Sequence, residues 1–403
     1  MTYGEIAQDR LTKIAACSSG DAGVTRLPFT PEHRAALDHI GAWMAAAGLE
    51  VRMDAAGTLI GRLDGPENAK TLLIGSHQDS VRQGGRYDGI MGIALGCLAL
   101  EKLQAKGIAL PFAVEILTFA DEEGVRFPTA LMGPRALAGT FDTDDLALVD
   151  QDGVTLAQAL ADFGGAPDDI AGLHRDPAGI LGYLEAHIEQ GPVLETADLP
   201  LGVVTGICGI ERNAVRFTGE TGHAGTVPMA GRRDALVAAS QFIAAVSDRA
   251  GKTNATRATV GTIRVLPDAV NAIPNVAQFP LEVRSVDDGA RAAFSDLMRD
   301  LGHQIAAESG TTFDMTRTYQ QPAVSCDAAL TRALLQGAGP QAISLASGAT
   351  HDASAMAGTC PIAMLFVRCK AGLSHHPDEY ARADDMGAGI DAIAAFLTGV
   401  AAS

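Results

Sequence analysis

The sequence has few aromatic residues and a deficit of positive charge. Aromatic residues make up 5% of the 403 residues, with a single tryptophan, so aliphatic side chains must supply most of the 47% apolar content that fills the core. Thirty Lys and Arg stand against 48 Asp and Glu, which gives a formal net charge of -18. Such an acidic chain is poorly suited to nucleic acid or an anionic membrane as its main partner. We therefore expect a small-molecule substrate.

Cysteine pairs and long apolar runs are also missing. The six cysteines show no C-x-x-C pair or regular spacing, which in a chain of this size favours reduced thiols in a cytoplasmic protein. The longest apolar stretches, such as "IMGIALGCLAL", are too short to cross a bilayer. The first residues, "MTYGEIAQDRLTKIAA", lack the apolar region of a secretory signal. These absences predict a cytoplasmic protein.

The first half of the chain alternates strands and helices. A helix is predicted after the cap Thr30, and a hairpin is predicted around 54–57. The runs "KTLLIGSH" and "PFAVEILTFA" are typical of strands buried on both faces, and the stretch "DGIMGIALGCLALEKLQAKG" between them predicts a helix. This alternation indicates a mostly parallel α/β sheet, whose ligands bind at the carboxyl ends of the strands.

The pattern changes from about residue 210. Runs such as "IERNAVRFTGE" and "VAQFPLEVRSV" alternate apolar and polar residues, as in an antiparallel sheet with one wet face. Two helical stretches separate them in the order β-α-β-β-α-β, which resembles a ferredoxin-like module. The first pattern then returns, with "QAISLAS" and "PIAMLFV" as buried strands. We predict one α/β domain formed by 1–209 and 321–403 and a smaller inserted α+β domain over 210–320.

Five segments place side chains of the metal-ligand type just after buried strands or at glycine-rich bends. They are "GSHQDSVRQGGRYDGIMG" (75–92), "FADEEGVRF" (119–127), "EAHIEQGPVLE" (185–195), "SGATHDA" (347–353) and "GLSHHPDEY" (372–380). His, Asp and Glu are the ligands that divalent cations of hard or borderline character require. Each segment alone is weak evidence, but their joint occurrence at strand ends indicates a metal site.

Together the five segments resemble the M20-type dinuclear metallo-amidohydrolases, in particular the hydantoinase/carbamoylase branch with N-carbamoyl-L-amino-acid hydrolases, allantoate amidohydrolases and β-ureidopropionases. The resemblance covers nearly the whole chain. It implies that His77, Asp88 and His187 hold one divalent ion. It implies that Asp88, Glu123 and His375 hold a second. Zinc is expected first, although the ligands also suit manganese, cobalt or nickel.

The resemblance also assigns the acid pair at the end of the predicted strand. Glu122 would be the general base, next to the ligand Glu123, and Asp79 would orient His77. The neighbouring Asp121 has no role beyond that of a solvated or structural turn residue. His376 falls on a variable position of the motif that contains His375.

The ligand His187 favours ureido substrates, because the peptidase and aminoacylase branches commonly have a carboxylate at this place. The resemblance further implies substrate contacts from the larger domain and from the inserted domain, with Arg284 as the clamp for a substrate carboxylate. Without the resemblance, Arg284 would be read as an exposed sheet residue. The implied substrate contacts are Gln190, Arg212, His223, Asn271, Arg284 and His351.

The expected activity is therefore hydrolysis of an N-carbamoyl C–N bond, giving the amino acid, carbon dioxide and ammonia. Allantoate or ureidoglycolate hydrolysis remains an alternative. So do a peptidase or N-acyl-amino-acid hydrolase, and a metal-dependent binding protein without catalysis. The inserted domain is expected to act as a lid and to pair two subunits in a homodimer. Whether its residues complete the site of their own subunit or of the partner stays open.

Overall fold

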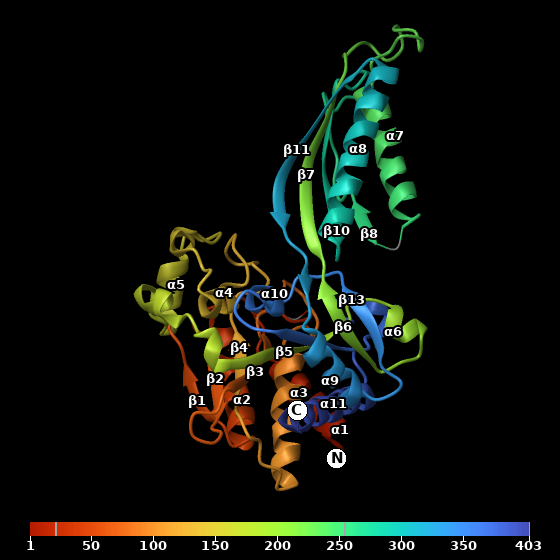
Figure 1. Ribbon diagram of the computed structural model, residues 1–403. Helices are drawn as coiled ribbons and strands as arrows, with labels where there is room; N and C mark the ends of the chain where they lie inside the picture. Colours follow the sequence, from red (N-terminus) through yellow and green to blue (C-terminus); the bar gives the residue numbers. More distant parts are fainter. Residues whose placement is uncertain (21, 254, 403) are drawn as a thin grey trace. The chain divides into compact units, whose positions relative to one another are not determined.

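The computed structural model describes residues 1–20, 22–253 and 255–402 (Figure 1). These residues form two compact units, which are described one at a time. The first consists of Met1–Thr205 and Ser325–Ser403, and the second of Gly206–Val324.

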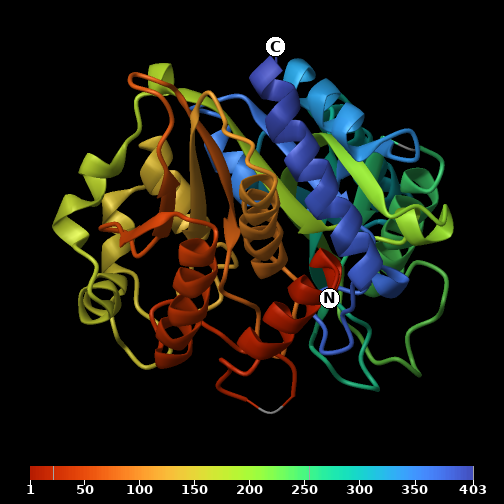
Figure 2. The same cartoon turned by 90° about the horizontal axis from the view of Figure 1, so that it is seen from below.

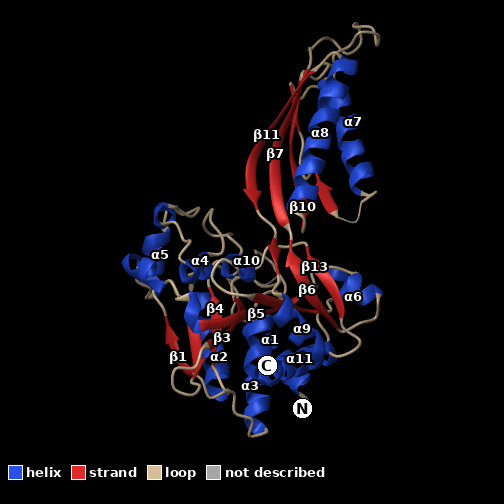
Figure 3. Ribbon diagram, viewed as in Figure 1, coloured by secondary structure: helices blue, strands red, loops and turns tan. Residues whose placement is uncertain are grey.

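The first unit combines a large sheet with helices on both faces (Figure 3). Its helices are α1 (Tyr3–Ile14), α2 (Pro31–Ala46), α3 (Ile90–Ala105), α4 (Met132–Ala138), α5 (Leu156–Phe163), α6 (Val193–Thr196), α9 (Ala328–Ala338), α10 (Asp352–Met356) and α11 (Ala383–Ala402), with short 3-10 helices η1 (Thr143–Ala147), η2 (Pro167–Leu173), η3 (Pro177–Gly179) and η4 (Lys370–Gly372). Its strands are β1 (Glu50–Met53), β2 (Leu59–Leu63), β3 (Thr71–His77), β4 (Ala113–Phe119), β5 (Ile180–Ile188), β6 (Leu201–Ile207), β12 (Val324–Ser325), β13 (Ile343–Ser347) and β14 (Ile362–Val367).

The sheet of this unit is mixed, so the prediction of a mostly parallel sheet was wrong. The strand order is β1-β2-β4-β3-β5-β14-β6-β12, with β13 paired to β6. The central strands β4, β3, β5 and β14 pair in parallel. The hairpin β1–β2 joins β4 antiparallel, and β6 returns antiparallel to β14. Hydrophobic runs identify buried strands but not the direction in which the outer strands are added.

Local sequence explains the central elements. The side chain of Thr30 accepts a hydrogen bond from the backbone N–H of His33 and so caps α2. At the predicted hairpin turn, Oδ1 of Asp54 accepts the N–H groups of Ala56 and Thr58, each at 2.9 Å. All residues of β4 and β14 are buried. In contrast, "QAISLAS" was wrongly predicted as buried, because β13 lies off the main strand path and is mostly half-exposed.

The main core lies between the sheet and the helices α1, α2, α3 and α11, which share one side of it (Figure 2). Helix α3 is apolar around most of its surface because it contacts the sheet as well as the three other helices. On the opposite side of the sheet lie α4, α5 and α10 (Figure 1). Among the described residues, no helix combines the length and the apolar character needed to cross a bilayer.

The second unit has an antiparallel sheet with two helices on one face (Figure 3). Its elements are β7 (Gly209–Thr218), α7 (Ala235–Ala250), β8 (Thr256–Thr259), β9 (Arg264–Leu266), β10 (Val276–Ser285), α8 (Asp288–Ser309) and β11 (Thr312–Gln321). The strand order is β11-β7-β10-β8, and β9 also pairs with β10. Pro280 lies opposite Ala214 of β7 and, on the other side of β10, between the stretches that pair with β9 and with β8.

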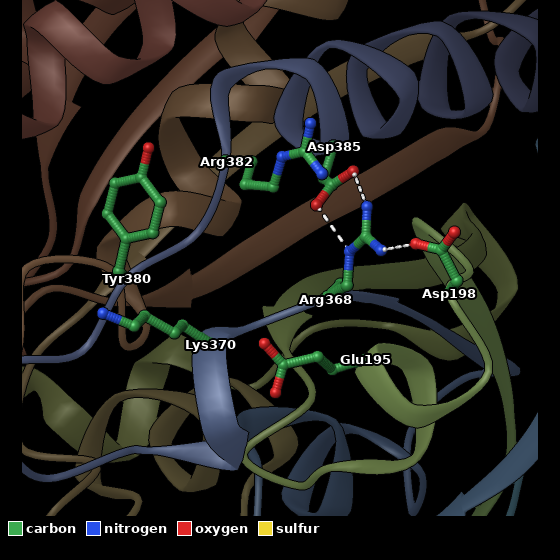
Figure 4. Close-up of a pocket in the computed structure, with 7 residues that line it drawn as sticks. All are labelled: Glu195, Asp198, Arg368, Lys370, Tyr380, Arg382 and Asp385. Atoms are coloured by element: carbon green, nitrogen blue, oxygen red, sulfur yellow. Dashed lines mark hydrogen bonds and ion pairs between the residues drawn. The ribbon is translucent and has the colours of Figure 1, made fainter.

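In the first unit, a charged pocket of about 320 Å³ opens beside the start of α11. Its lining residues are Glu195, Asp198, Arg368, Lys370, Tyr380, Arg382 and Asp385 (Figure 4). The guanidinium of Arg368 donates two hydrogen bonds of 2.8 Å to the buried carboxylate of Asp385 and one of 2.7 Å to Asp198. These bonds tie the end of β14 to α11 and to the turn before β6.

Replacing Arg368 by methionine should therefore lower the free energy of unfolding by about 3 kcal/mol, because Asp385 would stay buried without its cation. Arg382 is a control from the same pocket, since it pairs with the exposed Asp384 at 3.6 Å. Arg382→Met should cost less than about 1 kcal/mol. Urea denaturation measures the free energy of unfolding of both variants. An equal loss in both would contradict the structural importance of the Arg368–Asp385 pair.

Candidate metal centre

The parallel strands of the first unit bring three of the predicted segments to one edge of the sheet. His77 is the last residue of β3 and lies opposite Phe119, the last residue of β4. The acid cluster that begins at Asp121 follows β4 directly. His187 lies near the end of β5, the other neighbour of β3. Since the carboxyl ends of parallel strands meet at one edge, these side chains come together there.

Asp88 lies at the centre of the cluster, in the turn that precedes α3. Its Oδ1 atom is 3.4 Å from Nε2 of His77 and 3.1 Å from Nε2 of His187. Its Oδ2 atom is 3.6 Å from Nε2 of His375, which in turn lies 3.5 Å from Oε1 of Glu123. Both predicted triads therefore occur with their ligand atoms within 4.8 Å of one another, and they share Asp88.

The donor atoms are oriented for a cation. Nδ1 of His77 lies 3.0 Å from the backbone carbonyl of Asp79, and Nδ1 of His187 lies 3.0 Å from that of Ile188. When each Nδ1–H donates to its carbonyl, the neutral ring turns its Nε2 acceptor toward the carboxylate of Asp88, and Nε2 of His187 also accepts the backbone N–H of Gly89 at 3.2 Å. Two acceptors at this distance repel each other unless a proton or a metal ion lies between them. The buried Oε1 of Glu123 likewise has no hydrogen-bond partner. These residues fit divalent cations.

Asp79 contacts the acid pair as well as His77. Its Oδ1 and Oδ2 atoms accept the backbone N–H groups of Glu122 and Glu123, each at 3.2 Å. Oδ1 also lies 3.8 Å from Nδ1 of His77, beyond hydrogen-bond distance. The carboxylate thus fixes the backbone of the two glutamates and stands beside the histidine.

The three acids after β4 have different surroundings. Burial raises the pKa of Glu122 well above its usual range, and its side chain belongs to a group with His77 and Glu123. Asp121 is fully buried with a left-handed backbone (φ 59°), and burial raises its pKa as well. Of the two interpretations of Asp121, the solvated turn residue was therefore wrong, whereas a structural turn residue agrees with its burial. The turn is covered because the N–H of Met132, at the start of α4, bonds to the carbonyl of Asp121.

Two predicted substrate residues of the first unit lie beside the ligand groups. Nε2 of Gln190 donates a hydrogen bond of 2.8 Å to Oδ2 of Asp88. His351 is buried, with its ring 4.8 Å from that of His187 and its Nε2 2.7 Å from Oγ of Ser347. Both side chains are therefore positioned by the same cluster that would hold the metals.

The other four predicted substrate residues belong to the second unit, where they form two pairs. Arg212 and Arg284 both contact the carboxylate of Glu282, each at 2.7 Å. The strand residue Arg284 is half-buried rather than exposed. The carbonyl of Asn271 accepts the N–H of Ala224, so Asn271 lies next to the turn that begins at His223. His376, on the variable position, accepts the backbone N–H of Asp378 on Nδ1 at 3.1 Å and belongs to none of the ligand groups among the described residues.

Sequence reasoning missed the buried acid Glu185 on β5. Its carboxylate accepts hydrogen bonds from Oγ of Ser76 at 3.3 Å and from the backbone N–H of Ala353 at 2.8 Å. These contacts join the elements that carry His77, His187 and His351. The sequence could have indicated this residue, because Glu185 lies two residues before His187 in an apolar strand and so faces the same side of the sheet. Neighbouring Asp352 is also buried, with neither carboxylate oxygen hydrogen-bonded.

Negative charge accumulates around the ligand groups. Burial raises the pKa of six carboxyl groups, reaching about 8 for Glu123 and about 7 for Glu379. The six are Asp121, Glu122, Glu123, Glu185, Asp352 and Glu379. Burial alone would also raise the pKa of Asp88, but the facing imidazoles of His187 and His77, when protonated, hold it well below the usual range. Divalent cations would compensate this concentration of carboxylates.

Stability of the metal-free protein should consequently fall as pH rises. A carboxyl group with a raised pKa in the fold favours folding below its unfolded pKa, and this contribution is lost as pH rises through the folded pKa. For Glu123 this window runs from 4.5 to about 8. The raised pKa values of His77 and His187 act in the same direction, whereas the lowered pKa values of His33, His351 and Asp88 act in the opposite direction and are outnumbered.

Urea unfolding near the two ends of that window, with chelator and with zinc or manganese, measures the effect. The chelated protein should lose more stability toward high pH than the metal-loaded protein, whose carboxylates are compensated. The same pH dependence with and without the cations would contradict the metal assignment.

Comparison with known proteins agrees with this geometry. The family model "Peptidase family M20/M25/M40" matches residues 73–399. An N-carbamoyl-L-amino acid amidohydrolase of Geobacillus stearothermophilus is 37% identical over 98% of this chain and 97% of its own length. An allantoate deiminase of Arabidopsis thaliana is 36% identical over 96% of this chain and 81% of its own length.

Among solved structures, a hydantoinase/carbamoylase family amidase from Burkholderia multivorans superposes with a TM-score of 0.92. It is 33% identical, over 98% of this chain and 97% of its own. The resemblance predicted from the five segments is thereby confirmed. This chain belongs to the M20/M25/M40 peptidase family and is similar throughout its length to the hydantoinase/carbamoylase amidases.

Proposed function

We propose that this enzyme hydrolyses the ureido C–N bond of a carboxylate-bearing substrate such as an N-carbamoyl-L-amino acid. The observation that carries the proposal is the pair of ligand triads that share Asp88 next to the buried carboxyl of Glu122. The names of the full-length relatives supply the substrate class. Allantoate is the second candidate, because allantoate deiminases are nearly as similar to this chain.

Two divalent cations per subunit, zinc first, would occupy the two triads. His77, Asp88 and His187 would hold one cation. Asp88, Glu123 and His375 would hold the other. When bound, such a pair supplies Lewis acidity that polarises a carbonyl and lowers the pKa of water.

Glu122 would then act as general base and general acid. Its carboxylate takes a proton from the attacking water, and the water oxygen forms a bond to the ureido carbon. The protonated Glu122 returns that proton to the nitrogen as the C–N bond breaks, releasing the amino acid and carbamic acid. Carbamic acid decomposes to carbon dioxide and ammonia. Asp79 keeps Glu122 in place through the backbone N–H that it accepts.

The second unit would be a ferredoxin-like lid and dimerisation domain. Its strand order, β11-β7-β10-β8 with two helices on one face, supports this description. Arg212 and Arg284 lie together at the carboxylate of Glu282, and guanidinium groups are suited to bind a substrate carboxylate through paired hydrogen bonds. Further substrate contacts would come from Gln190 and His351 in the first unit and from His223 and Asn271 in the second. We further propose a cytoplasmic homodimer, in keeping with the free cysteines among the described residues.

A substrate panel tests the reaction class. N-carbamoyl-L-amino acids, allantoate, ureidoglycolate, N-carbamoyl-β-alanine, a dipeptide and an N-acetyl amino acid are each incubated with metal-loaded protein. Ammonia release is expected from ureido compounds that carry a carboxylate, with the N-carbamoyl-L-amino acids fastest. Faster cleavage of the dipeptide or the N-acetyl compound would overturn the assignment.

Glu122→Gln should lower kcat by at least about a thousandfold, since the amide cannot accept the proton of water. Metal content should stay at the wild-type value, because Glu122 belongs to neither proposed ligand triad. Metal analysis and steady-state kinetics separate these effects. Turnover that survives in a fully metal-loaded variant would mean that another group is the base.

A further inference from the structure

The proposed ligand His375 lies in a segment without regular structure. The segment runs from the end of η4 at Gly372 to the start of α11 at Ala383. The side chain of His375 is 49% exposed, and its backbone is left-handed (φ 56°). His77 and His187, in contrast, are held by buried strands. A ligand on such a loop needs a specific anchor if its imidazole is to stay near Asp88.

Glu379, four residues after His375, is this anchor in the structure. It is buried, and its Oε1 atom accepts the backbone N–H groups of Tyr87 at 2.8 Å and of Asp88 at 3.0 Å. The backbone N–H of Glu379 also bonds to the carbonyl of His376 at 3.0 Å, which closes a turn beside the ligand. One carboxylate thus joins the turn that carries Asp88 to the loop that carries His375, almost 300 residues away.

Gly85 leaves the space that this carboxylate occupies. A Cβ atom on Gly85 would lie 2.1 Å from both Cδ and Oε1 of Glu379, so any larger residue would displace the carboxylate. Gly85, the second glycine of "GGRYDG", is therefore needed to make room for the side chain of Glu379. Two further contacts join the same segments. Oγ of Ser374 bonds to the Asp88 carboxylate itself, and the rings of Tyr87 and Tyr380 meet edge to face at 6.0 Å.

We propose that Glu379 is a positioning residue for the second metal site. By accepting the backbone N–H of Asp88, Glu379 fixes the turn that carries the shared carboxylate. Because Glu379 lies on the same loop as His375, this bond also holds His375 near Asp88. The inference rests on the proposed function, because it assumes that Asp88, Glu123 and His375 hold a divalent cation. It adds that this site depends on a hydrogen-bond acceptor at position 379, whereas the triad of His77, Asp88 and His187 depends on it less.

The test compares variants of Glu379 with matched variants of Asp54. Asp54 is also buried and also accepts two backbone N–H groups on one oxygen, while its other oxygen has no partner. It lies in the β1–β2 turn, which carries no proposed ligand. Glu379→Ala, Glu379→Gln, Asp54→Ala and Asp54→Asn are prepared, together with wild type. Zinc and cobalt titrations give the number and affinity of the sites, and the visible spectrum of the cobalt form reports their coordination.

Wild type should bind two cations per subunit. Glu379→Ala should weaken the second cation by about 10–100-fold and change the cobalt spectrum. Glu379→Gln should stay within a few-fold of wild type, because the amide oxygen accepts the same two N–H groups. Asp54→Ala and Asp54→Asn should alter stability and leave both sites unchanged. If Glu379→Ala does not fold, Glu379→Asp and Gly85→Ala take its place, since each withdraws or displaces the acceptor.

The outcomes separate the two claims. A wild-type protein that binds no divalent cation would overturn the proposed function and this inference with it. Two cations in wild type and equally tight binding in Glu379→Ala would overturn only the inference. If Glu379→Gln loses as much affinity for the second cation as Glu379→Ala, the inference is also overturned, because a hydrogen-bond acceptor at position 379 would then not be sufficient.

Discussion

The carboxylate of Asp88 faces the imidazoles of His77 and His187 with one oxygen and the imidazole of His375 with the other. Acceptor atoms approach one another here at distances that only an intervening cation or proton makes favourable. The contact also links segments from distant parts of the sequence, which the parallel strands bring to one edge. Geometry and charge at the site therefore both depend on this one shared side chain.

The surrounding residues serve to hold that arrangement. Asp79 fixes the backbone of the acid pair, Glu185 joins the elements that carry three histidines, and Glu379 holds the turn of Asp88. Each of these is a buried carboxylate bonded to a backbone N–H group. Such bonds to the backbone orient the segments that carry the ligands. The cost is a concentration of buried negative charge, which the fold tolerates because divalent cations fit at its centre.

Much of the candidate site could be predicted from the sequence, because metal ligands follow strands that hydrophobic runs make visible. His77, Asp88 and His187 were named from such segments, and the structure brings them together. The outer strands were not predictable in the same way, because their direction depends on partners far away in the chain. The burial of Asp121 was missed for the same reason, since the residues that cover it follow in a separate helix.

The roles of some other residues could not be predicted from sequence patterns. Glu379 lies in a recognised motif, but its partners are backbone N–H groups, which have no signature in the sequence. Gly85 could be read as a turn residue, whereas its absent side chain makes room for that glutamate. For Arg212, His223, Asn271 and Arg284 the family resemblance implied substrate contacts, and the second unit shows their local partners.

The most direct measurement for the central claim is a crystal structure of the zinc-loaded protein with anomalous diffraction at the zinc edge. The account predicts two peaks per subunit, one bonded to His77 and His187, one bonded to Glu123 and His375, and Asp88 bonded to both. A single peak would contradict it, and so would two peaks that do not share Asp88.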